Sequence, residues 1–157
     1  MSLTDLIWLG TAFYAIHVAE EFMLNWRDWA RAVIGLPVEW SDFYIVNSIV
    51  VVLGIVAANL SVTWPAVALA YPGLMLINAV FFHILPVIRT GGRYSPGVAT
   101  AVVLFLPLGI AAYWTALANG SVGVGGGIAS LAIGAALMAL PIVLLNIKDR
   151  PYFRQDR

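Results

Sequence analysis

The sequence contains no cysteine, which excludes disulfide bonds, thiolate metal sites, iron–sulfur clusters and cysteine nucleophiles. Charged residues are scarce: they make up 10% of the 157 residues, against 62% hydrophobic residues, and the mean hydropathy is +0.93. Soluble domains carry about 25% charged residues, so soluble enzyme and binding folds are excluded. Eight Lys and Arg balance eight Asp and Glu, which leaves no basic excess for binding nucleic acid.

Long hydrophobic runs are what the sequence does contain. A hydrocarbon layer about 30 Å thick is crossed by a helix of about 20 mostly apolar residues. Five runs approach this length and predict an all-α, polytopic transmembrane bundle that forms a single domain over residues 1–157. We expect the spans at residues 3–23, 43–60, 65–87, 96–118 and 128–147.

Proline and tryptophan residues subdivide these runs. Ser95 is expected to cap the fourth helix, with Pro96 in its first turn. Other prolines lie inside or at the end of spans, where a missing N–H should bend the helix: Pro72, Pro86, Pro107 and Pro141. Residues 25–35 combine tryptophan with arginine, which predicts a short helix lying in the headgroup region.

The basic residues predict the orientation of the chain. They follow the first, third and fifth runs, and the other connections contain none: Arg27, Arg31, Arg89, Arg93, Lys148, Arg150, Arg154 and Arg157. Positively charged loops remain on the cytoplasmic side, so five spans put the amino terminus outside and the carboxyl terminus inside. We therefore expect an integral protein of a bacterial cytoplasmic membrane.

The first run carries three polar residues that the bilayer disfavours. In His17-Val18-Ala19-Glu20-Glu21 the imidazole and the two carboxylates are spaced i, i+3 and i+4, so they share one helix face, which Tyr14 extends. A charged acid at a helix centre costs about 2.5–3.5 kcal/mol on the insertion scale. The face is therefore expected to point into the bundle, where these side chains find partners.

Candidate partners lie at a similar depth in other runs. His83 of the third run is expected in the same layer, with Asn47 and Asn78 as further polar residues. Arg89 and Tyr94 follow the third run and should lie over the opening of the site. Together they predict a polar pocket in the cytoplasmic half of the bundle.

The pentapeptide from His17 to Glu21, in the first span of a small polytopic protein, resembles the signature of the HXXEE family of membrane proteins. His83 after Asn78, and the sequence from Tyr94 to Gly97, are similar to later motifs of that family. The resemblance implies where the site lies. It implies no reaction, because the family has no assigned function.

Two kinds of chemistry fit these residues. His17, Glu20, Glu21 and His83 are four ligands suited to a divalent transition metal such as zinc, iron or manganese. Without a metal, Glu20 or Glu21 is a candidate general acid or base that His17 and Tyr14 orient. Haem between the two histidines is disfavoured by the adjacent carboxylates, and a purely structural hydrogen-bonded cluster is the alternative without chemistry.

The leading hypothesis is a membrane-embedded enzyme that acts on a hydrophobic small molecule of isoprenoid or acyl type, with Asn47, Asn78, Arg89 and Tyr94 binding the substrate. A proton- or metal-coupled carrier and a ligand-binding or sensory subunit are the alternatives. The partners expected are the lipid bilayer, the small molecule and, through a small-residue face with Ser130 and Gly134, a second copy of the chain.

Overall fold

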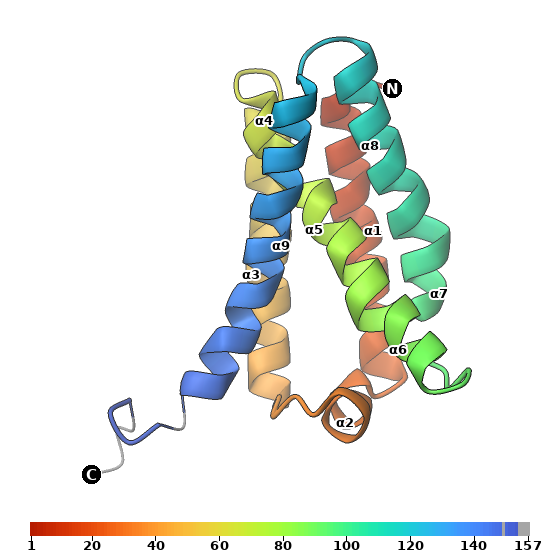
Figure 1. The fold of residues 1–157 in the computed structure, drawn as a ribbon, viewed down its shortest axis with the longest axis vertical. Helices are drawn as coiled ribbons and strands as arrows, with labels where there is room; N and C mark the ends of the chain where they lie inside the picture. Colours follow the sequence, from red (N-terminus) through yellow and green to blue (C-terminus); the bar gives the residue numbers. More distant parts are fainter. Residues whose placement is uncertain (149, 154–157) are drawn as a thin grey trace.

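A computed structural model describes residues 1–148 and 150–153, and these residues form helices and no strand. The elements join into five long helical segments with one short segment between the first two (Figure 1). The elements are α1 (Leu3–Met23), α2 (Trp26–Trp29), η1 (Ala30–Ile34), α3 (Trp40–Leu60), α4 (Pro65–Ala68), α5 (Ala70–Asn78), η2 (Ala79–Ile84), α6 (Leu85–Arg89), α7 (Val98–Thr100), η3 (Ala101–Phe105), α8 (Leu106–Ala118) and α9 (Val124–Ile147). Those numbered η are π-helical turns.

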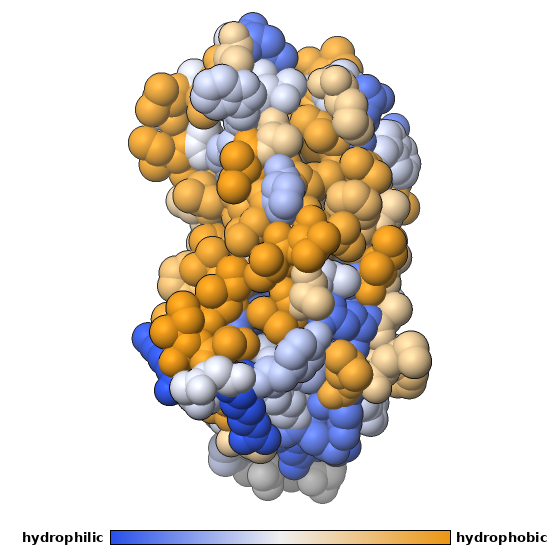
Figure 2. Space-filling view, turned by 90° about the vertical axis from the view of Figure 1, so that its right-hand side faces the viewer, coloured by the Kyte–Doolittle hydropathy of each residue, from blue (hydrophilic) through white to orange (hydrophobic). Residues whose placement is uncertain are grey.

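Four of the long segments have the length and apolar composition of membrane-spanning helices: Trp40–Leu60, Pro65–Arg89, Val98–Ala118 and Val124–Ile147. The remaining one, α1, is less hydrophobic because it carries His17 and three acidic residues. Figure 2 shows the corresponding surface, with hydrophobic residues around the middle of the molecule and hydrophilic ones gathered toward its ends. The chain is an integral membrane protein with an all-helical fold.

The segment Pro65–Arg89 is the central helix of the bundle. Within its most apolar window 61% of the residues are buried, compared with 33% or fewer in the other three spanning helices. It crosses the bundle obliquely, so that α6 ends beside α7 while α9 stays near α3 (Figure 1). This oblique path separates α6 from α9 at the end of the molecule that contains α2.

Glycine allows α9 to pack directly on this central helix. A Cβ atom at Gly134 would lie 2.5 Å from the Leu74 nitrogen and 2.8 Å from the Ala70 oxygen. Ser130, one turn earlier, is also buried and lies 3.1 Å from the Tyr113 hydroxyl. Ser130 and Gly134 are therefore packed against α5 and α8 within the chain, and association with a second copy stays a prediction.

Two prolines follow π-helical turns. Pro86 is the second residue after η2, and Pro107 is the second residue after η3. A proline lacks the N–H for the usual helical hydrogen bond and its ring crowds the preceding turn, and a wider π turn relieves that crowding. The third run therefore does not end at Pro86 but continues to Arg89.

The short segment between α1 and α3 packs on the bundle as well as facing the membrane surface. Trp29 and Ala30 are buried together with Val38 and with Leu145 of α9. Arg27 and Arg31 both bind the carboxylate of Glu39, and their guanidinium groups lower the pKa of that exposed carboxyl. The segment therefore connects the ends of α1, α3 and α9.

We expect Gly134→Ala to destabilise the protein by about 1–3 kcal/mol, because the added methyl group overlaps the α5 backbone. Gly125→Ala on the same helix is the matched control, since a Cβ there meets nothing within 4 Å. Unfolding of both variants in detergent, followed by circular dichroism, measures the difference. Equal midpoints for the two variants would contradict the close packing of α9 on α5.

Candidate metal centre

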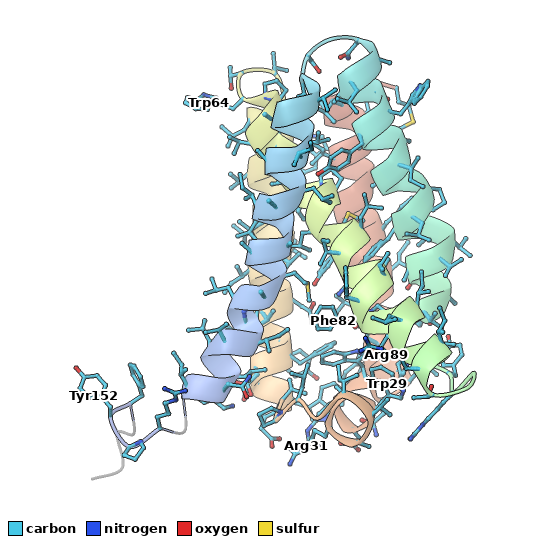
Figure 3. The ribbon with its side chains drawn as sticks, in the orientation of Figure 1. Trp29, Arg31, Trp64, Phe82, Arg89 and Tyr152 are labelled. Carbon is cyan, nitrogen blue, oxygen red and sulfur yellow. The ribbon has the colours of Figure 1, made fainter. Side chains whose placement is uncertain are left out.

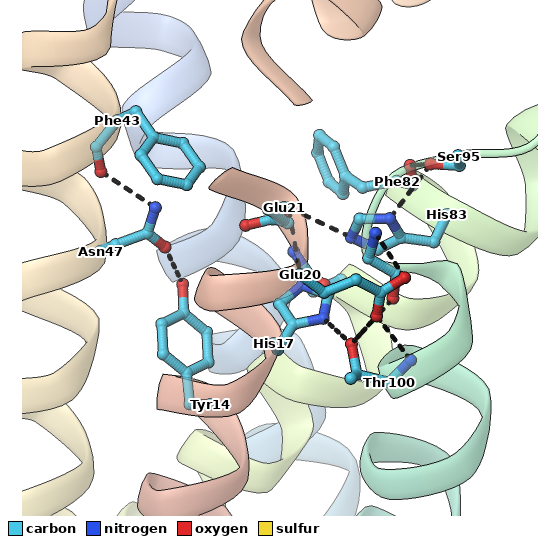
Figure 4. A network of polar contacts seen from close by, with 12 residues as sticks. Tyr14, His17, Glu20, Glu21, Phe43, Asn47, Phe82, His83, Ser95 and Thr100 are labelled. Atoms are coloured by element: carbon cyan, nitrogen blue, oxygen red, sulfur yellow. Dashed lines mark hydrogen bonds and ion pairs between the residues drawn. The ribbon is translucent and has the colours of Figure 1, made fainter. Parts of the chain in front are cut away.

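The polar residues of α1 and η2 meet in a buried group made of His17, Glu21 and His83. Their exposed fractions are 0%, 4% and 0%. One oxygen of Glu21 lies 3.5 Å from Nε2 of His17 and 3.5 Å from Nε2 of His83. The two imidazole rings are 4.8 Å apart and nearly perpendicular (Figure 4). We call these three residues the His–Glu–His group.

The helices explain how these side chains come together. His17 and Glu21 are four residues apart on α1, so they project from one face on successive turns. His83 belongs to the π turn η2, which exists because Pro86 follows it. The ring of Phe105, whose centre is 4.4 Å from that of His17, packs against the group from η3.

The hydrogen bonds of His17 determine which of its nitrogens carries the proton. Nδ1 lies 2.8 Å from the Thr100 hydroxyl oxygen, and that oxygen lies 2.6 Å from a carboxylate oxygen of Glu20. A carboxylate only accepts, so Thr100 donates its hydrogen to Glu20 and accepts one from Nδ1 of His17. Nε2, which faces Glu21, is then left with a lone pair.

His83 is oriented in the same way from another element. Its Nδ1 lies 3.1 Å from the Ser95 hydroxyl, which donates a long 3.5 Å hydrogen bond to the Phe82 carbonyl. That carbonyl is free because Pro86, four residues later, has no N–H to donate to it. Ser95 therefore accepts the Nδ1 proton of His83, and Nε2 again carries a lone pair.

Three atoms that accept hydrogen bonds thus face one another with no donor between them. Nε2 of His17 and Nε2 of His83 are buried and have no hydrogen-bond partner among the described residues. A buried carboxylate beside two lone pairs is unfavourable unless a positive charge lies among them. The group therefore favours a partner that donates hydrogen bonds or carries a positive charge, such as a proton or a metal ion.

The two nitrogen–oxygen distances fit a metal ion. Ligand atoms 2.0–2.2 Å from a tetrahedral zinc are about 3.4 Å from one another. The two nitrogen–oxygen separations are 3.5 Å, and all three ligand atoms lie within 4.8 Å of one another. Two imidazoles and one carboxylate suit zinc, iron or manganese and leave coordination positions open for water or substrate. The His–Glu–His group can hold such an ion.

Glu20, predicted as a metal ligand, is not part of this group. Its carboxylate accepts hydrogen bonds from the backbone N–H groups of Gly97, Ala99 and Thr100 at 2.9–3.3 Å. It also accepts one from the Tyr94 hydroxyl at 2.5 Å. A carboxylate in this position satisfies the free N–H groups at the start of a helix and complements its dipole. Glu20 thus caps the α7–α8 segment and orients His17 through Thr100.

Tyr94 lies beside Glu20 and donates a hydrogen bond to it, and its expected place over a substrate opening stays a prediction. Partial burial and the hydrogen bond to Glu20 raise the pKa of Tyr94 to about 12, so the phenol stays protonated and donates. Arg89 is also placed away from the group, since it lines a separate surface hollow with Pro86 and Thr90. Figure 3 shows Arg89 at the end of the bundle near Trp29.

The other predicted residues lie on the far side of Glu21, toward α3. Tyr14 donates a 2.5 Å hydrogen bond to the side-chain oxygen of Asn47. Asn78 is buried, and its Nδ2 has only a 3.8 Å contact with the sulfur of Met138. These three residues and Glu21 line one small cavity, which is described below.

Three residues of the site were not predicted as such: Ser95, Gly97 and Thr100. Ser95 was expected as a helix cap, but the helix begins at Val98 with Gly97 as its cap. Gly97 has φ +94°, and a Cβ on it would lie 2.6 Å from Cε1 of His83 and 2.7 Å from Cε1 of His17. The Ser-Pro-Gly sequence signalled a turn here, but nothing in it indicated contact with both histidines.

The fold and the site together define an all-helical membrane protein with a buried two-histidine, one-glutamate centre. Residues 8–112 match the family described as a protein of unknown function with HXXEE motif, and the chain belongs to this family. The matched segment contains the His–Glu–His group, Glu20, Ser95 and Thr100. No curated protein and no solved structure matches the chain.

We expect Gly97→Ala to displace both imidazoles and to lower the stability by about 1–3 kcal/mol. Gly91→Ala is the matched control: Gly91 also has a positive φ, +68°, but a Cβ there meets nothing within 4 Å. Thermal unfolding in detergent together with the histidine ring resonances in NMR spectra distinguishes the two. Unchanged ring resonances in Gly97→Ala would contradict the contact.

Proposed function

We propose that this protein is a membrane-embedded enzyme whose reactive centre is a divalent transition metal held by His17, Glu21 and His83. The observation that carries the proposal is the convergence of three lone-pair atoms, each histidine having its other nitrogen fixed by a hydroxyl group. Second hydrogen bonds of this kind are typical of metal-binding histidines. A bound metal would polarise a substrate oxygen or activate a water molecule.

The proposal includes the membrane topology. We propose that α1 is a fifth span, because it runs beside α3 and α8 through the bundle and its polar face is buried there. The described basic residues lie beyond or at the ends of the long segments, at one end of the bundle: Arg27, Arg31, Arg89, Arg93, Lys148 and Arg150. The positive-inside rule makes that end cytoplasmic, so the metal centre belongs to the cytoplasmic half.

An enzyme fits the molecule better than a carrier does. A proton or metal pathway needs ionisable residues across the whole membrane. In the outer half of the described bundle Asp5 is the only ionisable acidic or basic side chain, and it lies in the first turn of α1, where Ser2 caps the helix. The polar residues therefore form a site with access from one half and no relay to the other.

The substrate that fits this position is hydrophobic. The cavity that borders Glu21 is lined mainly by apolar side chains and continues into a groove between two spanning helices. An acyl or isoprenoid molecule dissolved in the bilayer would reach Glu21 by this route without entering water.

Metal analysis of the purified protein tests the proposal. We expect about one equivalent of zinc, iron or manganese in the native protein, and its loss in His17→Ala, Glu21→Gln and His83→Ala. Thr100→Val should bind the metal about 10–100-fold more weakly, because Thr100 only orients a ligand. Asp28→Asn, which changes an exposed carboxylate, is the control and should retain both the metal content and the metal affinity of the native protein.

Circular dichroism and gel filtration establish that each variant is folded. A full equivalent of metal in folded Glu21→Gln and His83→Ala would place the ion elsewhere and overturn the proposal. A native protein that binds none of the three metals after dialysis against each would assign the group to a buried shared proton.

A further inference from the structure

A small cavity of about 70 Å³ lies against Glu21 on the side of α3 and α9. Two polar atoms of residues that line it have no hydrogen-bond partner among the described residues. One is the side-chain oxygen of Asn78, a residue only 6% exposed, and the other is the indole nitrogen of Trp26. Leaving a buried polar atom unpaired costs about 1–3 kcal/mol, so each points to a missing partner.

These two atoms define the chemistry of that partner. The Asn78 oxygen accepts a hydrogen bond and the Trp26 N–H donates one. A hydroxyl group can both donate and accept, and therefore suits either atom. The charged residues lining the cavity are Glu21 and Asp42, both acidic, and the volume admits only a few non-hydrogen atoms. Phosphorylated and other large anionic head groups do not fit this lining.

The cavity opens sideways toward the membrane. It shares Val46, Val50, Leu137, Pro141 and Leu145 with a groove of about 380 Å³ between α3 and α9. The outer walls of the groove are exposed apolar side chains on both helices, among them Ile49 of α3 and Leu140 of α9. A hydrocarbon chain in the groove would have its polar end beside Glu21.

An ion pair closes the groove at one end. Nζ of Lys148, at the end of α9, lies 2.7 Å from an Asp42 oxygen in the first turn of α3. Because the cation is paired with Asp42, it neutralises that acid and offers no separate site for an anionic head group. The entrance that remains faces the hydrocarbon layer.

We propose that the ligand of this site is a long-chain, single-chain alcohol whose hydroxyl group occupies the cavity and whose hydrocarbon chain lies in the groove between α3 and α9. The inference rests on the proposed function, because it places the hydroxyl group beside the metal ligand Glu21. It goes beyond that function by naming the head group, the chain's path and the route of entry.

The probe for this proposal is hexadecanol with a diazirine midway along its chain, photolysed with the purified protein in lipid nanodiscs. We expect cross-links on α3 and α9 at groove residues, and competition by unlabelled hexadecanol. Val46→Trp fills the junction of cavity and groove, and Asn78→Leu removes the acceptor. Each should weaken labelling about fivefold to tenfold, the effect of losing one hydrogen bond or a comparable contact.

Val52→Trp is the matched control, since Val52 is an exposed residue of α3 that lines neither the cavity nor the groove. It should label like the native protein. Labelling that hexadecanol does not compete, or that Val46→Trp leaves unchanged, would overturn the inference. Equal labelling by diazirine-bearing palmitate or lysophosphatidylcholine would overturn the assignment of the head group.

Metal content is measured in the same samples, so that a failure of the metal centre can be distinguished from a failure of the alcohol site. Suppose that the protein contains no metal, but that its labelling is competed by hexadecanol and weakened by Val46→Trp. This result would support the alcohol site and overturn the metal centre. A full equivalent of metal with unspecific labelling would overturn the alcohol site alone.

Discussion

Three buried acceptor atoms that repel one another are held together in this protein, and the surrounding structure depends on offsetting that repulsion. The imidazole nitrogens of His17 and His83 and the carboxylate of Glu21 converge in the buried interior of a membrane protein. Hydroxyl groups from two other segments fix the opposite side of each ring. A positive charge between the three acceptors would offset their repulsion. The surrounding helices hold the acceptors in position around that point.

Backbone features explain why the centre can form within a small bundle. Pro86 generates the wide turn that carries His83 and leaves the Phe82 carbonyl free for Ser95. Gly97 lets the chain pass directly beside both rings. The groove between α3 and α9 connects the cavity beside Glu21 with the apolar outer surface of the bundle. One proline and one glycine thus shape the site, and two neighbouring helices provide its access.

The sequence allowed the helices and the main residues of the site to be predicted, because both follow from local rules. Hydrophobic length located the helices, and the i, i+4 spacing put His17 and Glu21 on one face. The same spacing assigned Glu20 to the site, because periodicity describes a helix face and not the partner across from it. The roles of Ser95 and Thr100 depend on a π turn and a left-handed glycine, and hydropathy and spacing patterns do not reveal either one.

The two adjacent glutamates of the motif, Glu20 and Glu21, have different roles. Glu21 faces the ring nitrogens, whereas Glu20 caps the start of the α7–α8 segment and reaches His17 only through Thr100. Their adjacency in the sequence alone would suggest that both acids face the two imidazoles. The five-residue signature of the family therefore combines a candidate metal ligand, Glu21, with a residue that supports the fold, Glu20, and relatives that replaced its first acid would have to support that helix by other means.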